Sequence, residues 1–227
     1  MRVVSLVPSA TETLLAWGIR PVAVTRFCEQ PDLPHVGGTK DPDVAAIVDL
    51  HPDLVVMCEE ENRREDAEVL EAAGLARHVV RIDSLDDVTP QMAALADAVG
   101  APRPPPWVPP APADPDERRR AFVPIWRRPW MTMSGGCYGS SLLAALGIDN
   151  VFADAATRYP PVALSDVAAR RPDVVVAPSE PYPFTERHRA ELEAVAPVWF
   201  VDGQDLFWWG ARTPGACQRL GDRWRDR

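Results

Sequence analysis

The sequence has 227 residues, of which 46% are hydrophobic and 25% are charged, a composition that is ordinary for a globular protein and excludes general disorder. Its formal net charge is −9, and no Lys/Arg-rich patch is present. Binding to nucleic acid or to an anionic membrane is therefore not expected, because both depend on clustered positive charge. No stretch approaches the roughly 18 apolar residues that a membrane span needs.

The chain starts directly with a predicted strand, Val3 to Val7, which leaves no room for a signal peptide. As written, the sequence predicts a cytoplasmic protein; an upstream start would make it extracytoplasmic. The four cysteines form no C-x-x-C pair and are too few for a disulfide scaffold. We expect free thiols at Cys28, Cys58, Cys137 and Cys217.

Strands and helices alternate through the first half of the chain. Ser9 and Glu12 form a capping-box pattern that predicts a helix from Ser9 to Gly18. Further strands are predicted at Val22 to Thr25, Leu54 to Met57 and Val79 to Ile82, and helices between and after them are predicted to be capped by Asp41, Asn62 and Ser84. This alternation predicts a small parallel α/β lobe over residues 1–99.

A proline-dense segment follows, with eight prolines between Gly100 and Glu117. Helix is excluded there, because each proline removes a backbone donor and clashes with the preceding turn. We interpret residues 100–120 as an extended linker between lobes, with a partner-binding proline motif as the alternative.

The second half, residues 121–227, repeats the alternation, with strands predicted at Phe122 to Trp126, Val151 to Phe152, Val174 to Ala177 and Val198 to Val201. Pro124 suggests an edge position or a bulge in its strand. Helices are predicted to be capped by Ser165 and Thr185.

The two halves share a local pattern. PDVVVAPSE, starting at Pro172, matches PDLVVMCEE, starting at Pro52, so that Glu180 corresponds to Glu60. Four apolar residues bounded by turn signals suit a strand covered on both faces, as in a parallel sheet. The fold class is therefore α/β, with two lobes that each contain a parallel sheet flanked by helices.

Ligands of parallel sheets gather at the carboxyl ends of the strands, where both glutamates and many aromatic residues fall. Large flat side chains beside scattered polar groups suit a broad, partly apolar ligand, and Arg212 offers a guanidinium for a polar edge. Trp208 and Trp209 are candidate ligand contacts, although a tryptophan also commonly belongs to a core.

Catalysis is not expected, because neither a paired nucleophile and base nor a metal cluster is evident, and no cofactor is predicted. The alternative function is a cytoplasmic thiol or metal site in which Cys28, Cys58 and Cys137 converge as soft ligands or as a reactive thiol.

Several segments resemble one family in order and spacing: MRVVSLVPSATETLLAWG, VGGTKDPD, LHPDLVVMCEEENRRED, SSLLAALGIDNVFAD, PSEPYPFTERH and VDGQDLFWWGAR. They are similar to the cobalamin and iron-siderophore binding proteins of ABC importers, the helical-backbone metal receptor family, and most resemble its cobalamin-binding branch. The resemblance covers most of the chain except the proline segment.

The resemblance implies two α/β lobes facing across a ligand cleft, a monomer, and capture of a corrinoid or related metal chelate without catalysis. It implies a pocket from Phe27, Cys58, Tyr138, Trp208 and Arg212, to which Trp209 is added from its position. It also implies that an acidic residue of each lobe meets arginines of the permease: Glu180 in the second lobe, and Glu60, Glu61 or Glu65 in the first. The long helix that joins the lobes in this family is matched here by a shorter, proline-dense region.

Overall fold

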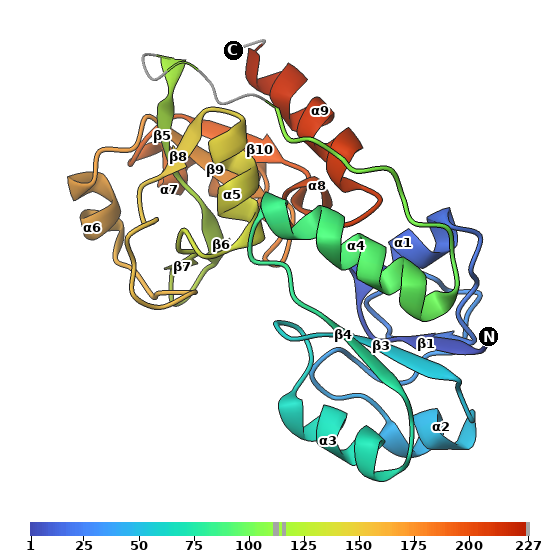
Figure 1. Ribbon diagram of the computed structural model, residues 1–227. Coiled ribbons are helices and arrows are strands. Elements are labelled where there is room, and N and C mark those ends of the chain that lie inside the picture. Colours follow the sequence, from blue (N-terminus) through green and yellow to red (C-terminus); the bar gives the residue numbers. More distant parts are fainter. Residues whose placement is uncertain (111–113, 115–116, 226–227) are drawn as a thin grey trace. The chain divides into compact units, whose positions relative to one another are not determined.

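The computed structural model describes residues 1–110, 114 and 117–225. It contains two four-stranded parallel sheets, each flanked by helices (Figure 1). This arrangement confirms the predicted α/β fold class. The chain divides into two compact units. Unit 1 comprises Met1–Ile82, Asp87–Trp107 and Trp209–Arg212, and unit 2 comprises Asp83–Asp86, Val108–Trp208 and Thr213–Arg227.

Unit 1 is built on a sheet of strand order β2-β1-β3-β4, in which every pairing is parallel. Figure 1 shows α2 and α3 on one face of this sheet and α1 and α4 on the other. Ile47 of α2 and Leu70 of α3 pack with Val55 and Met57 of β3 in one buried cluster. The elements are β1 (Val3–Ser5), α1 (Pro8–Ala16), β2 (Ala23–Val24), α2 (Val44–Asp49), β3 (Leu54–Cys58), α3 (Arg64–Ala72), β4 (Arg77–Val80) and α4 (Leu85–Val99).

Unit 2 has the strand order β10-β9-β5-β8, again with parallel pairing throughout. Val167 of α6 and Leu192 of α7 pack with Phe122 and Val175 in a second buried cluster. A short antiparallel ribbon, β6 and β7, follows β5. The elements are β5 (Arg119–Phe122), β6 (Pro124–Trp126), β7 (Met131–Thr132), α5 (Tyr138–Ala145), β8 (Ile148–Asn150), α6 (Leu164–Ala169), β9 (Val174–Pro178), η2 (Glu186–His188), α7 (Arg189–Glu193), β10 (Val198–Val201), α8 (Gly203–Phe207) and α9 (Thr213–Arg225).

The repeated Pro-Asp motif has the same role in both units. Asp53, just before β3, accepts a hydrogen bond from the backbone N–H of Arg2 at 2.5 Å, and its own N–H donates to the Arg2 carbonyl. Asp173, just before β9, makes the same pair of bonds with Arg120 at the start of β5. If β1, β2, β3 and β4 are matched with β5, β8, β9 and β10, the two strand orders are identical. The sequence repeat therefore reflects a repeated fold.

The predicted strand Val79 to Ile82 is displaced by two residues, because β4 is Arg77–Val80. Two predicted strands of unit 2 also differ from the observed ones. The predicted strand Phe122 to Trp126 is divided, because β5 ends at Phe122 and Pro124 begins β6, where the pairing register shifts. The sequence predicts an edge position or a bulge at Pro124, and the pairing of β6 with β7 is irregular between Pro124 and Trp126. The predicted strand Val151 to Phe152 is wrong, since β8 ends at Asn150 and the following residues form turns.

Three predicted helix caps in unit 1 are wrong. α1 begins at Pro8, whose missing N–H costs nothing in a first turn, so Ser9 lies inside the helix. α2 is capped by Asp43, which accepts from the N–H of Ala46, whereas Asp41 pairs with Arg26. Asn62 is not a helix cap: its side chain is buried and accepts from the N–H of Cys58.

In unit 2, α6 starts after Ala163, so the predicted cap Ser165 is inside the helix and that prediction is wrong. Thr185 does precede a helical segment, η2, and its backbone N–H donates to Nδ1 of His188 at 3.0 Å.

The start of the proline-dense segment is held against α4. Arg103 forms a bidentate ion pair with Asp97, with N to O distances of 2.7 and 2.5 Å. The backbone N–H of Trp107 lies 3.3 Å from Oγ1 of Thr89, which in turn lies 3.2 Å from the Trp107 carbonyl. The predicted linker 100–120 stays a prediction, and residues 111–113 and 115–116 lie outside the described residues. Within the described part of the chain, no helix is both long and apolar enough to cross a membrane.

Removing either aspartate of the repeated Pro-Asp motif should weaken folding. Asp53→Ala or Asp173→Ala deletes the acceptor for a backbone N–H at the start of a central strand, and each should lower the free energy of unfolding by about 1 kcal/mol. Urea denaturation followed by circular dichroism measures this. Asp49→Ala, at the end of α2, is the matched control and should not lower the free energy of unfolding, because Asp49 is exposed and its carboxylate faces the negative end of the helix dipole.

Candidate functional site

Loops at the carboxyl ends of the parallel strands carry the candidate site residues in each unit. In unit 1 these loops are the segments after β2 and β3, and the segment Trp209–Arg212, from late in the sequence, also belongs to this unit. In unit 2 they are the segments after β5, β9 and β10. Parallel pairing places all carboxyl ends of one sheet at the same edge, so each set of loops belongs to one edge.

Phe27 lies in the loop after β2 and exposes half of its surface, which is unusual for a large aromatic side chain. The guanidinium of Arg26 lies 4.8 Å from the centre of its ring, and Arg26 is itself paired with Asp41. An exposed aromatic face beside a cation is suited to contact with a flat ligand.

A buried polar network holds this loop in place. Oγ1 of Thr11 in α1 lies 2.8 Å from Oγ of Ser5 and 3.2 Å from Sγ of Cys28. Oγ1 of Thr25 also lies 3.2 Å from Sγ of Cys28, and all four side chains are buried. The residues on both sides of Phe27 are therefore fixed to α1 and β1 while its ring stays exposed.

Cys58 ends β3 and is 3% exposed. Burial, with a smaller effect from the nearby Glu61 carboxylate, raises the pKa of its thiol to about 12. Burial also raises the pKa of Cys28, and it raises that of Cys217 to about 11. Such thiols stay protonated near neutral pH and are poor nucleophiles, which argues against the alternative thiol site. Among residues 1–110, 114 and 117–225, no group of three or more His, Cys, Asp or Glu side chains is placed to hold a metal ion.

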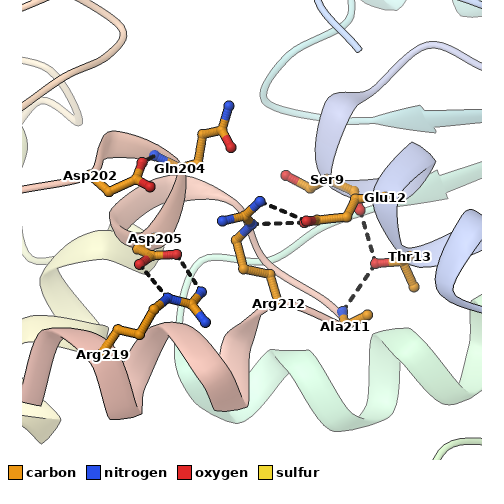
Figure 2. A network of polar contacts seen from close by, with 9 residues as sticks. All are labelled: Ser9, Glu12, Thr13, Asp202, Gln204, Asp205, Ala211, Arg212 and Arg219. Atoms are coloured by element: carbon orange, nitrogen blue, oxygen red, sulfur yellow. Dashed lines mark hydrogen bonds and ion pairs between the residues drawn. The ribbon is translucent and has the colours of Figure 1, made fainter. Parts of the chain in front are cut away.

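The segment Trp209–Arg212 is anchored to α1 within unit 1, as Figure 2 shows. Nε and Nη2 of Arg212 donate to the two carboxylate oxygens of Glu12 at 2.9 and 2.7 Å. The N–H of Ala211 donates to Oγ1 of Thr13 at 3.1 Å. Gly210 has φ of +97°, and a Cβ there would lie 2.2 Å from the Thr13 hydroxyl, so glycine is required.

This anchor was not expected from the sequence. The predicted capping box of Ser9 and Glu12 is wrong, because the carboxylate of Glu12 binds Arg212 instead. The two residues are 200 positions apart, so no local pattern links them. Arg212, predicted to meet the ligand, therefore already has one edge of its guanidinium bound to a carboxylate.

In unit 2, Tyr138 begins α5 and is 4% exposed, and its hydroxyl lies 2.9 Å from Oγ1 of Thr213. Burial raises the pKa of this phenol. Trp208 directly follows α8 and is half-buried, whereas Trp209, in unit 1, is buried. Also in unit 2, the buried Asp205 of α8 forms a bidentate pair with Arg219 of α9, which fixes the two helices to each other (Figure 2).

An aromatic cluster follows β9. Trp130 stacks on Phe184 with ring centres 5.9 Å apart, and Tyr182 lies 4.8 Å from Phe184. Trp126 of β6 meets Tyr182 edge-on at 5.6 Å and remains 44% exposed. The sequence predicts aromatic loops here, but it predicts Trp126 only as the end of a strand and not as an exposed aromatic residue.

The glutamates proposed to dock a permease occupy equivalent places. Glu60 is the second residue after β3 and is exposed, and its carbonyl accepts from Nζ of Lys40 at 2.7 Å. Glu180 is the second residue after β9 and is partly buried against Gly203, where a Cβ would lie 2.4 Å from Cγ of Glu180. Their predicted location at strand ends is what the structure shows; their role stays a prediction.

No protein-family model matches the chain. A vitamin B12-binding protein of Vibrio parahaemolyticus is 26% identical over 214 residues, which are 87% of this chain and 75% of that protein. One of Salmonella paratyphi A is 27% identical over 77% of this chain and 71% of that protein.

Solved structures agree with the sequence matches. The periplasmic vitamin B12-binding protein BtuF of Vibrio cholerae superposes with a TM-score of 0.78 at 22% identity, covering 99% of this chain and 96% of that one. The chain is a distant homologue of the vitamin B12-binding proteins. The heme-binding protein BhuT, in complex with two hemes, superposes almost as well, with a TM-score of 0.77 at 20% identity over 99% and 98% of the two chains.

These findings confirm the predicted resemblance. The chain has the bilobed fold of periplasmic binding proteins of the cobalamin and heme type. The vitamin B12-binding protein of Vibrio parahaemolyticus, to which the chain is similar in sequence, is named for binding and not for catalysis.

The cysteines should be nearly inert in the folded protein. With a pKa of about 12, only about one Cys58 thiol in 10,000 is ionised at pH 8, because burial disfavours the thiolate. We expect Ellman's reagent to react slowly with the native protein at pH 8 and with all four thiols in urea. Rapid reaction of one thiol in the native protein would contradict the burial of the cysteines and would favour the alternative function, a reactive thiol site.

Gly203→Ala should disturb the position of Glu180. The added methyl would lie 2.4 Å from Cγ and 2.6 Å from the backbone N of Glu180, so the loop after β9 must move, at a cost of about 1–3 kcal/mol in the free energy of unfolding. Gly136→Ala is the matched control, since the nearest atom there is 3.8 Å away. Equal unfolding midpoints for the two variants would show that the loop accommodates the methyl.

Proposed function

We propose that the protein binds a corrinoid, a cobalamin-like ligand, and delivers it to an ABC-type importer. The observation that carries this proposal is the homology to vitamin B12-binding proteins, which extends at 25–27% identity over 77–94% of the chain. An ABC transporter substrate-binding protein of Listeria monocytogenes also shares the fold, with a TM-score of 0.73.

The local structure supports a broad, flat ligand. Phe27 and Trp126 each present an exposed aromatic face in a loop or strand beyond the carboxyl end of a sheet. We propose that Phe27, Trp208 and Arg212 touch the ligand. Cys58, Tyr138 and Trp209 are buried, and a contact of these side chains with the ligand stays a prediction.

Heme is the ligand from which a corrinoid must be distinguished, because the fold alone suits both. The two ligands differ at their edges: heme bears two carboxylates, whereas the side chains of cobalamin end in carboxamides. They differ also at the metal, since heme iron in proteins is held by an axial side chain. The direct test therefore offers both ligands to the same protein.

Titration of the purified protein with cobalamin, cobinamide and heme should give saturable quenching of tryptophan fluorescence by the corrinoids. Phe27→Ala should weaken corrinoid binding about tenfold, because it removes an exposed aromatic contact. Val69→Ala, which truncates an equally exposed apolar residue on α3, should leave the affinity unchanged.

Three results would decide the matter. Corrinoid binding that is weakened by Phe27→Ala supports the proposal. Saturable binding of heme alone would assign the protein to heme. No binding of any of the three ligands at high micromolar concentration would refute the proposed function.

Delivery to a permease rests on Glu60 and Glu180. We propose that they pair with arginines of the permease, one from each unit. Charge pairs of this kind raise association rates and fix orientation more than they add affinity.

A further inference from the structure

The anchor between Glu12 and Arg212 changes the charge that a ligand would meet. Arg212 is one of the proposed ligand contacts, and its side chain is 18% exposed. Its guanidinium is paired through two nitrogens with the carboxylate of Glu12, which is 33% exposed. A group that approaches Arg212 therefore meets an ion pair whose net charge is zero.

An ion pair and a lone cation select different ligand groups. A carboxylate is attracted to a lone guanidinium, but here it would also be repelled by Glu12, whose oxygens are within 3 Å of the guanidinium nitrogens. A carboxamide oxygen accepts a hydrogen bond but carries no net charge, so the Glu12 carboxylate does not repel it as it repels a carboxylate. The pair thus favours neutral amide edges over carboxylate edges.

We propose that Glu12 is a specificity-determining residue that makes the site prefer a ring ligand with carboxamide side chains over one with carboxylate side chains. The proposal rests on the proposed function, in particular on contact between Arg212 and the ligand.

The structure allows the charge of Glu12 to be removed without releasing the segment. The N–H of Ala211 is bound to Thr13, and the backbone of Gly210 packs closely on the same hydroxyl, so two contacts independent of Glu12 hold Trp209–Arg212 on α1. Glu12→Gln keeps the size of the side chain and one oxygen that accepts from Arg212, while it removes the negative charge and the second acceptor.

The test uses two probes with the same corrin ring and cobalt, dicyanocobinamide with amide side chains and dicyanocobyrinic acid with carboxylate side chains. The wild-type protein should bind the amide probe more tightly. In Glu12→Gln the ratio of the two dissociation constants should shift toward the carboxylate probe by about tenfold, as expected for one additional charge-assisted hydrogen bond. The shift should shrink at high salt, because both side chains are partly exposed.

A second variant gives the opposite sign and does not depend on the first one folding. Arg212→Gln leaves the negative charge of Glu12 uncompensated, so the ratio should shift further toward the amide probe. Asp97→Asn is the matched control: it removes one negative charge from another bidentate pair of unit 1, with Arg103, and should leave the ratio unchanged.

The outcomes separate this inference from the proposed function. Wild-type protein that binds corrinoids, with the same ratio in both variants, overturns the role of Glu12 alone. An equal shift in Asp97→Asn would also overturn it, because the effect would then come from net charge. Wild-type protein that binds neither probe refutes the proposed function, and this inference with it.

Discussion

Parallel pairing of the central strands is the constraint on which the rest of the structure depends. β3 pairs with β1, and β9 pairs with β5, with every strand of each sheet running in the same direction. Each pairing begins at an aspartate that binds the backbone of the neighbouring strand, Asp53 in one unit and Asp173 in the other. Because all strands then end at one edge, the loops that follow them are brought together there, although they are far apart in the sequence. The candidate ligand residues follow from that arrangement.

The two units use one topology for different loops. The strand after each Pro-Asp motif is buried on both faces, which leaves its side chains little freedom to vary in polarity. The loops beyond the strands have no such restriction. In unit 1 the loop after β2 presents Phe27 and is fixed by hydroxyl and thiol contacts. In unit 2 the loop after β9 carries Tyr182 and Phe184, and Phe184 stacks on Trp130.

The sequence predicted what depends on neighbouring residues. The apolar runs located β3, β9 and β10, and proline at position 124 indicated the irregularity in its strand. Prediction from the sequence failed where a polar side chain had several possible hydrogen-bond partners. Glu12, Asp41 and Asn62 each fit a helix cap, but each binds a group outside the helix: Arg212, Arg26 and the backbone of Cys58. Capping patterns describe local competition for hydrogen bonds, and they cannot include a partner that only the folded chain supplies.

Helix α1 shows how much of the candidate site depends on such partners. Three consecutive residues, Thr11, Glu12 and Thr13, point in different directions because each residue of a helix is rotated by about 100° from the last. Thr11 holds the loop of Phe27, Glu12 binds Arg212, and Thr13 binds the backbone of Ala211. One short helix therefore joins the loop after β2 to a segment near the end of the chain. It also sets the charge of that segment, since Arg212 is neutralised where it is anchored. Position and charge at this edge of unit 1 thus have a common origin in three adjacent residues of α1.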